Sequence, residues 1–239
     1  MAEINLLAKY PRAKRNVAAR KLGQADNRLV ARQFGREYFD GTREQGYGGY
    51  RYDGRWLPIA RDIAAHFKLK TGDRVLDIGC AKGFLMRDLM EIVPGLEVWG
   101  LEISHYAIEN CHPDAQGRIV RGTAQMLPFA SGSFAAALCI NAIHNLGLNA
   151  CVEAVKEIER VAPRRGYIQV DAYRNDDERD AFLDWVLTAE TFGKPDMWRQ
   201  LFARAGYTGS YYWTILEIDP EWTMRAAAPG REHHQEPGR

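Results

Sequence analysis

The chain has 239 residues, of which 46% are hydrophobic and 26% charged, so it is long enough to bury the core of one domain. Its formal net charge of +1 gives no electrostatic reason to expect a nucleic acid partner. No apolar run approaches the roughly 20 residues of a membrane span, and the basic N-terminus lacks the apolar core of a signal peptide. The four cysteines lack metal-ligand spacing, so we expect no metal site, and a cytoplasmic protein with reduced thiols.

Residues 1–36 form a locally basic segment, with nine lysines and arginines against two acidic residues. Such a surplus could contact RNA, but aromatic residues are nearly absent from it. We therefore interpret the segment as a solvated helical arm, which could pack on a partner subunit in a homodimer.

The run 46–56 is rich in residues that are costly to order, with three tyrosines, four glycines and two arginines. It is therefore not expected to be a plain linker. Residues 57–69 follow with apolar residues at helical spacing, which predicts a helix that covers a sheet.

Residues 74–91 read as a strand, a turn and a helix. The turn is Asp77-Ile78-Gly79-Cys80-Ala81-Lys82-Gly83, and its two glycines permit positive φ and a close approach of a nucleotide to the backbone. A dinucleotide loop would have a glycine in place of Ala81, and the carboxylate of Asp77 would repel a diphosphate. The same carboxylate suits a cofactor that carries an ammonium and a sulfonium, which is S-adenosylmethionine.

This turn resembles the first motif of the class I S-adenosylmethionine-dependent methyltransferases, in which an acidic residue, any residue, a glycine, three residues and a second glycine follow one another. Two later segments fit the same family. Leu96 to Glu102 reads as a strand that ends in an acid 23 residues after Gly79, near the roughly 20 expected for a ribose ligand. Residues 121–134 resemble the family's adenine loop, with Thr123 where an acid usually stands.

The resemblance implies a cofactor site at the ends of several strands. The residues assigned to it are Asp77, Gly79, Cys80, Gly83, Glu102, Ile103, Thr123, Ala124, Gln125 and Asn141. In similar methyltransferases the segment before the first strand folds over the cofactor, so Tyr50, Tyr52 and Arg55 become the predicted substrate-binding residues.

Two further strands, 135–140 and 167–171, end in polar residues that should lie at the same edge of the sheet. His144 follows the first of them and is the candidate general base, because an imidazole titrates near pH ~6.5. Asp171 ends the second and could orient the imidazole or bind an acceptor hydroxyl. A structural role for the histidine is the alternative.

The expected fold is therefore α/β, with a Rossmann-like, doubly wound, mostly parallel seven-stranded sheet. Gly206-Tyr207 and residues 211–217 fit the antiparallel hairpin that ends the sheet in the family. The predicted organisation is an arm and covering segment over 1–56, the methyltransferase domain over 57–223, and a flexible tail over 224–239.

The predicted function is methyl transfer from S-adenosylmethionine to a small-molecule acceptor such as a sugar or secondary metabolite, with O-methylation favoured. Three alternatives stay open at this point: an RNA methyltransferase that uses the basic arm, a non-catalytic S-adenosylmethionine-binding protein, and a nicotinamide oxidoreductase. Ala81 and the charge of Asp77 argue against the last of these.

Overall fold

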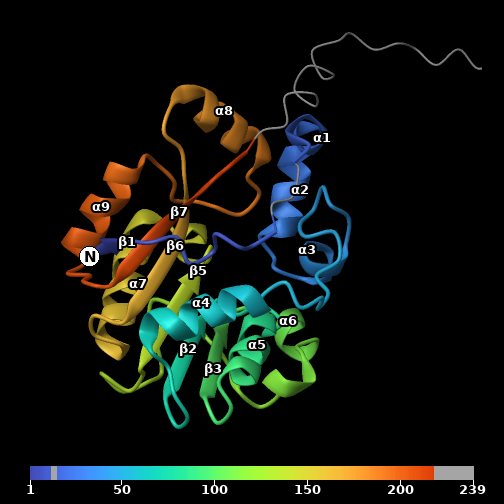
Figure 1. Ribbon diagram of the computed structural model, residues 1–239. Helices are drawn as coiled ribbons and strands as arrows, with labels where there is room; N and C mark the ends of the chain where they lie inside the picture. Colours follow the sequence, from blue (N-terminus) through green and yellow to red (C-terminus); the bar gives the residue numbers. More distant parts are fainter. Residues whose placement is uncertain (12–14, 218–239) are drawn as a thin grey trace, which may run out of the picture.

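The structure is a computed structural model and describes residues 1–11 and 15–217. One sheet of seven strands runs through the molecule, in the order β1-β7-β6-β5-β2-β3-β4 (Figure 1). Every pairing in it is parallel. The strands are β1 (Ala2–Glu3), β2 (Arg74–Ile78), β3 (Glu97–Glu102), β4 (Ile119–Arg121), β5 (Ala136–Ile140), β6 (Gly166–Ala172) and β7 (Ser210–Ile215).

Helices cover both faces of this sheet, which confirms the predicted Rossmann-like fold. On one face the apolar sides of α7 and α9 pack against the strands, and on the other face those of α4 and α5 do. The helices are α1 (Val17–Lys21), α2 (Gln24–Ala31), α3 (Arg36–Asp40), α4 (Leu57–Phe67), α5 (Phe84–Ile92), α6 (His105–Glu109), α7 (Leu148–Val161), α8 (Asp176–Trp185) and α9 (Pro195–Arg204), with 3-10 turns η1 (Pro113–Ala115) and η2 (Ile143–Asn145).

The predicted antiparallel C-terminal hairpin is wrong. Strand β7 lies parallel to β6, with Tyr167 opposite Ser210 and Ala172 opposite Ile215. The reason is the connection: α9 returns the chain across the sheet to the end from which β6 starts, so β7 runs in the same direction. The other neighbour of β7 is the N-terminal strand β1, also parallel to it.

Residues 1–11 are therefore tied to the edge of the sheet, although most of their side chains are exposed. The amide of Ile4 donates to the carbonyl of Tyr211 at 2.9 Å, and Leu6 is buried in the core. Arg12 and Lys14 of the predicted arm, and the predicted flexible tail 224–239, lie outside the described residues. The predicted domain boundary after residue 56 stays a prediction.

Helices α1 and α2 dock on the C-terminal end of α8 (Figure 1). The side chains of Gln24 and Arg28 donate to the carbonyls of Leu183 and Val186, where α8 ends. These carbonyls lack helical partners, and a cation near them is favoured by the helix dipole. Helix α8 ends at Trp185, and Val186 after it has an extended backbone.

Candidate functional site

The site lies where β2, β3, β5 and β6 end, on one edge of the parallel sheet. The loop after β2 turns sharply, because Gly79, Ala81 and Gly83 all have positive φ, of 76°, 50° and 74°. An alanine with positive φ is strained, and such strain persists only where surrounding contacts fix it. Here the amide of Ala81 is held by the carboxylate of Glu102 at 2.8 Å.

Gly79 is required for a second reason, which is the close approach of the next loop. A Cβ added at Gly79 would lie 2.4 Å from the Cβ of Ala142, in the segment that follows β5. The loops after β2 and β5 are therefore packed together only because residue 79 has no side chain.

We expect Gly79→Ala to lower the free energy of unfolding by about 2–4 kcal/mol, from the clash with Ala142 and the unfavourable φ together. Gly117→Ala is the matched control, because Gly117 has a similar φ of 71° but nothing within 4 Å of the added Cβ. The control should lose only about 1–2 kcal/mol. Urea denaturation of both variants measures this, and equal losses would contradict the close packing of the two loops.

Two buried carboxylates stand side by side at this edge. Asp77 is 4% exposed and Glu102 is 7% exposed. Burial and the negative charge of Glu102 raise the pKa of Asp77 to about 7. Burial also raises the pKa of Glu102, although hydrogen bonds from the backbone amides of Ser104, Ala81 and Ile103 oppose that shift.

Those three amides fix the orientation of the Glu102 carboxylate. Ile103 and Ser104 donate to Oε1 at 2.8 and 2.9 Å, and Ala81 donates to Oε2. Each carboxylate oxygen has about two acceptor sites, so Oε1 is fully used and Oε2 keeps capacity for one hydroxyl of a ligand. The side chain of Ile103, next to Glu102 in the chain, is exposed. It therefore offers an apolar surface on which a flat ring could pack.

Lys82 is the cation of the turn, and it points away from this acidic edge. Its ammonium lies 2.6 Å from the carboxylate of Asp40 and 3.2 Å from the carbonyl of Tyr50. The Tyr106 hydroxyl donates to the same carboxylate at 2.7 Å. The edge near Asp77 and Glu102 therefore stays electronegative, which fits a cationic ligand with ribose hydroxyls and disfavours a diphosphate.

The same contacts fasten the segment 34–50 over the turn. Phe39 packs on Ala81, and Ser104 donates to the carbonyl of Phe34 at 2.5 Å. Tyr50 stacks on Phe84 with ring centroids 4.8 Å apart. It also lies near Asp77, because burial and then the charges of Tyr10 and Asp77 raise the pKa of Tyr50. Of the three predicted substrate-binding residues, Tyr50 is the one placed at this edge.

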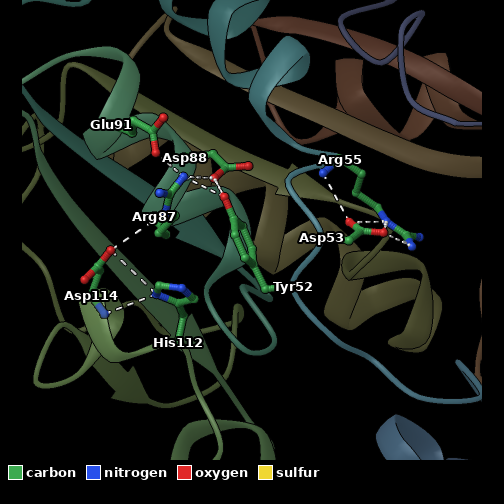
Figure 2. A network of polar contacts seen from close by, with 8 residues as sticks. All are labelled: Tyr52, Asp53, Arg55, Arg87, Asp88, Glu91, His112 and Asp114. Atoms are coloured by element: carbon green, nitrogen blue, oxygen red, sulfur yellow. Dashed lines mark hydrogen bonds and ion pairs between the residues drawn. The ribbon is translucent and has the colours of Figure 1, made fainter.

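Tyr52 and Arg55 have other partners, and Figure 2 shows Tyr52 beside Arg87 and Asp88, and Arg55 beside Asp53. The Tyr52 hydroxyl donates to the buried Asp88 of α5 at 2.6 Å and accepts from Arg87. Burial and Asp88 raise the pKa of Tyr52 to about 12. Arg55 is paired with Asp53 instead, at 2.9 Å. Tyr52 thus anchors the covering segment to α5, and the charge of Arg55 is already compensated.

The loop after β4 and the residue Cys80 also belong to the predicted cofactor site. Gly122 donates to the carbonyl of Glu102, which brings the loop of Thr123, Ala124 and Gln125 beside the ribose candidate. In this loop the Thr123 hydroxyl donates to the Gln125 side chain at 3.3 Å. The Cys80 side chain points into the core between β2 and β3, so this residue can offer only its backbone to a ligand.

Asn141 has a positive φ of 53° and accepts a hydrogen bond from Thr214 at 2.9 Å, which leaves its amide NH2 group to face the edge. His144 is buried, at 4% exposure, and its Nδ1 accepts from the backbone N–H of Asp171 at 3.1 Å. The ring proton is therefore on Nε2, which lies 3.6 Å from Oδ2 of Asp171. Burial lowers the pKa of His144, and Asp171 opposes this.

Sequence reasoning missed Asp40, the partner of Lys82. The sequence did indicate that such an acid exists. A lysine in a turn that binds a cationic ligand would repel that ligand unless an acidic residue pairs with the lysine. Nothing in the sequence said which acid. Among residues 1–11 and 15–217, no group of three or more histidine, cysteine or acidic side chains could hold a metal ion. In the same residues no helix is both long and apolar enough to cross a membrane.

The fold and this edge define a Rossmann-like α/β protein with its polar groups gathered at the carboxyl ends of the strands. Comparison with known proteins identifies the family. The profile described as "Methyltransferase domain" matches residues 76–170. These residues form a class I S-adenosylmethionine-dependent methyltransferase domain, and S-adenosylmethionine is the methyl donor of that family.

Two curated proteins are similar over part of the chain. Sterol 24-C-methyltransferase ERG6B of Gibberella zeae is 27% identical over 126 residues, which cover 48% of this chain and 33% of that protein. Malonyl-[acyl-carrier protein] O-methyltransferase of Legionella pneumophila is 25% identical over 119 residues, 47% of this chain and 40% of that protein. Each match thus spans less than half of the curated relative. The solved structure of YcgJ from Bacillus subtilis is 21% identical, covers 70% of this chain and 77% of its own, and has a TM-score of 0.48.

Proposed function

We propose that the protein transfers the methyl group of S-adenosylmethionine to a hydroxyl of a small-molecule acceptor. Binding of S-adenosylmethionine is supported above all by the two buried carboxylates of Asp77 and Glu102. The one lysine of the adjacent turn, Lys82, is paired with Asp40 and not with them. In this proposal Oε2 of Glu102 accepts from one ribose hydroxyl, and Asp77 faces the cationic part of the cofactor.

The other predicted cofactor residues take supporting roles in the proposal. Gly79, Cys80 and Gly83 offer backbone at close approach, and Asn141 offers its amide NH2 group. Ile103 and the loop of Thr123, Ala124 and Gln125 flank the adenine, because they lie next to Glu102.

The bound cofactor supplies a methyl group that the sulfonium has already activated for an in-line displacement. The protein then has to position the acceptor and take its proton. The carboxylate of Asp171 would hold the acceptor hydroxyl and take the proton that it loses on methylation. That carboxylate is 22% exposed, whereas the imidazole of His144 is buried, with Nδ1 occupied and Nε2 protonated. His144 therefore acts as a positioning residue for Asp171.

The two curated relatives support a small-molecule acceptor, because their names specify a sterol and a malonyl group on a carrier protein. They differ in whether carbon or oxygen is methylated, so they do not select the acceptor atom. The choice of a hydroxyl is supported by Asp171, a carboxylate at this edge that can take the proton that a hydroxyl loses.

A calorimetric titration tests the cofactor part. We expect S-adenosylhomocysteine to bind the protein with a micromolar dissociation constant and NADH to show no binding at the same concentrations. Binding of NADH alone would remove the proposal. An acceptor screen with labelled S-adenosylmethionine then separates an enzyme from a non-catalytic binding protein, because the latter would bind the cofactor and transfer nothing.

The RNA-methyltransferase alternative rests on the basic arm, and many of its charges have partners within the chain. Lys9 pairs with Asp62 at 2.7 Å, Lys21 with Asp184 at 2.9 Å, and Arg28 donates to the end of α8. These contacts favour a structural role for the arm. A homodimer through this arm stays a prediction, as does the cytoplasmic location.

A further inference from the structure

Three arginines of the N-terminal segment gather around one indole ring. The guanidinium carbons of Arg15, Arg20 and Arg43 lie 5.2, 3.8 and 5.8 Å from the ring centre of Trp185, the last residue of α8. A guanidinium over an indole gains a cation–π attraction, but three cations at one ring also repel one another. We call Arg15, Arg20 and Arg43 the arginine cluster.

Arg20 is the buried member of the cluster. It is 7% exposed, and its terminal nitrogen donates to the carbonyls of Arg43 and Gly46. Its Nε is buried and has no hydrogen-bond partner among the residues that the structure describes. Burial and the charges of Arg43 and Arg15 lower the pKa of Arg20 to about 10. A buried cation with an unpaired donor is costly unless an anion completes its environment.

The nearby acids do not supply that anion. Asp184, next to Trp185, is bound to Lys21. The charge of Glu44 raises the pKa of Arg20, but burial and the charges of Arg43 and Arg15 lower it by more. Burial and the charge of Arg15 are the main causes that lower the pKa of Arg43. Among the described residues, then, no carboxylate within ion-pair distance of the arginine cluster balances its charge.

The cluster is joined to the methyl-transfer edge by a short piece of chain. Downstream of Trp185, the amides of Glu190 and Thr191 donate to the carbonyl of His144 at 2.9 and 3.0 Å. Between these points the side chain of Thr188 meets the hydroxyl of Tyr38, which also contacts Tyr47. Residues 185–191 therefore run from the arginine cluster to the carbonyl of His144, whose imidazole lies beside Asp171.

We propose that the arginine cluster binds an anionic group of the acceptor, a carboxylate or a phosphate, at the end remote from the methylated hydroxyl. This inference rests on the proposed function. Arg55, which the sequence predicted to bind substrate, is paired with Asp53, so the arginine cluster takes the anionic group in its place. The chemistry fits, since guanidinium groups form two parallel hydrogen bonds with either anion.

The test is a calorimetric titration of the full chain at low ionic strength with two probes, malonate and inorganic phosphate. Arg43→Gln is the informative variant, because Arg43 is the exposed member of the cluster and its loss leaves the buried contacts of Arg20 in place. We expect it to weaken binding of the preferred probe at least fivefold. Arg179→Gln is the matched control, an arginine of α8 that pairs with Asp176 and Asp180 and should leave probe binding unchanged.

Preference for malonate would assign the site to a carboxylate, and preference for phosphate would assign it to a phosphate. Absence of binding of both probes, or equal weakening in the two variants, would overturn the inference. S-adenosylhomocysteine is titrated into the same samples. If it binds while the probes do not distinguish the variants, only the anion site is lost, and if it fails to bind, the proposed function falls.

Discussion

Asp77→Asn is expected to make the protein more stable and at the same time to weaken cofactor binding by a factor of 30 or more. In the ligand-free protein the Asp77 carboxylate is buried beside Glu102, which raises its pKa to about 7. The usual value is about 3.9, so ionisation at pH 8 costs folding free energy on the order of 1–4 kcal/mol. The neutral amide of asparagine removes that cost, and with it the charge that we propose faces the cofactor's cation.

The sign of the pH dependence follows from the same shift. The folded protein holds the Asp77 proton more tightly than the unfolded chain, so this stabilisation is full below pH ~4 and is lost as the pH rises through about 7. Cofactor binding needs the ionised form and should therefore weaken several-fold between pH 8 and pH 6. Asp77→Asn should abolish both dependences.

The measurements are thermal unfolding of the ligand-free protein and calorimetric titration with S-adenosylhomocysteine, each at pH 6 and pH 8. Asp73→Asn is the matched control, because Asp73 lies just before β2 and is paired with Lys70, which lowers its pKa. The control should be slightly less stable and bind the cofactor normally. A destabilised Asp77→Asn variant with normal affinity would contradict both the electrostatic cost and the assigned role.

The sequence predicted the strands around the site well, because each is a short apolar run that ends in a polar residue. Strands β2, β3, β5 and β6 are such runs, and their parallel order brings Asp77, Glu102, Asn141 and Asp171 to one edge. The C-terminal hairpin could not be judged in this way. Whether β7 runs parallel or antiparallel depends on where α9 delivers the chain, and the apolar pattern of residues 210–215 is the same for both.

The covering segment was harder to predict, because its contacts join residues that are far apart in the chain. The pairing of Lys82 with Asp40 and the stacking of Arg20 on Trp185 have no local signature. Tyr52 and Arg55 were selected from the composition of the segment and from the place of that segment in similar methyltransferases, and neither says which way a side chain points. Glycine-rich turns and helix caps are encoded locally, whereas these pairings are fixed only by the packing of the arm.

Asp171→Asn is expected to lower the rate of methyl transfer by about 10²–10³, because the variant keeps the shape of the side chain but cannot take the acceptor's proton. Affinity for S-adenosylhomocysteine should change less than threefold, since Asp171 is not part of the acidic pair that holds the cofactor. The rate is measured in single turnovers with an acceptor found in the screen. Asp180→Asn is the control, an exposed acid of α8 that pairs with Arg179.

His144→Gln separates the two assignments of the base. A glutamine oxygen can accept the backbone N–H of Asp171 as Nδ1 does, so the variant should preserve the local fold and lower the rate only about tenfold, through the position of Asp171. If His144 itself took the proton, the glutamine variant would lose as much rate as Asp171→Asn. We expect the tenfold loss of rate, because neither ring nitrogen of His144 is available to take a proton. Nδ1 accepts the amide of Asp171, and Nε2 already carries the ring proton, 3.6 Å from Oδ2 of Asp171.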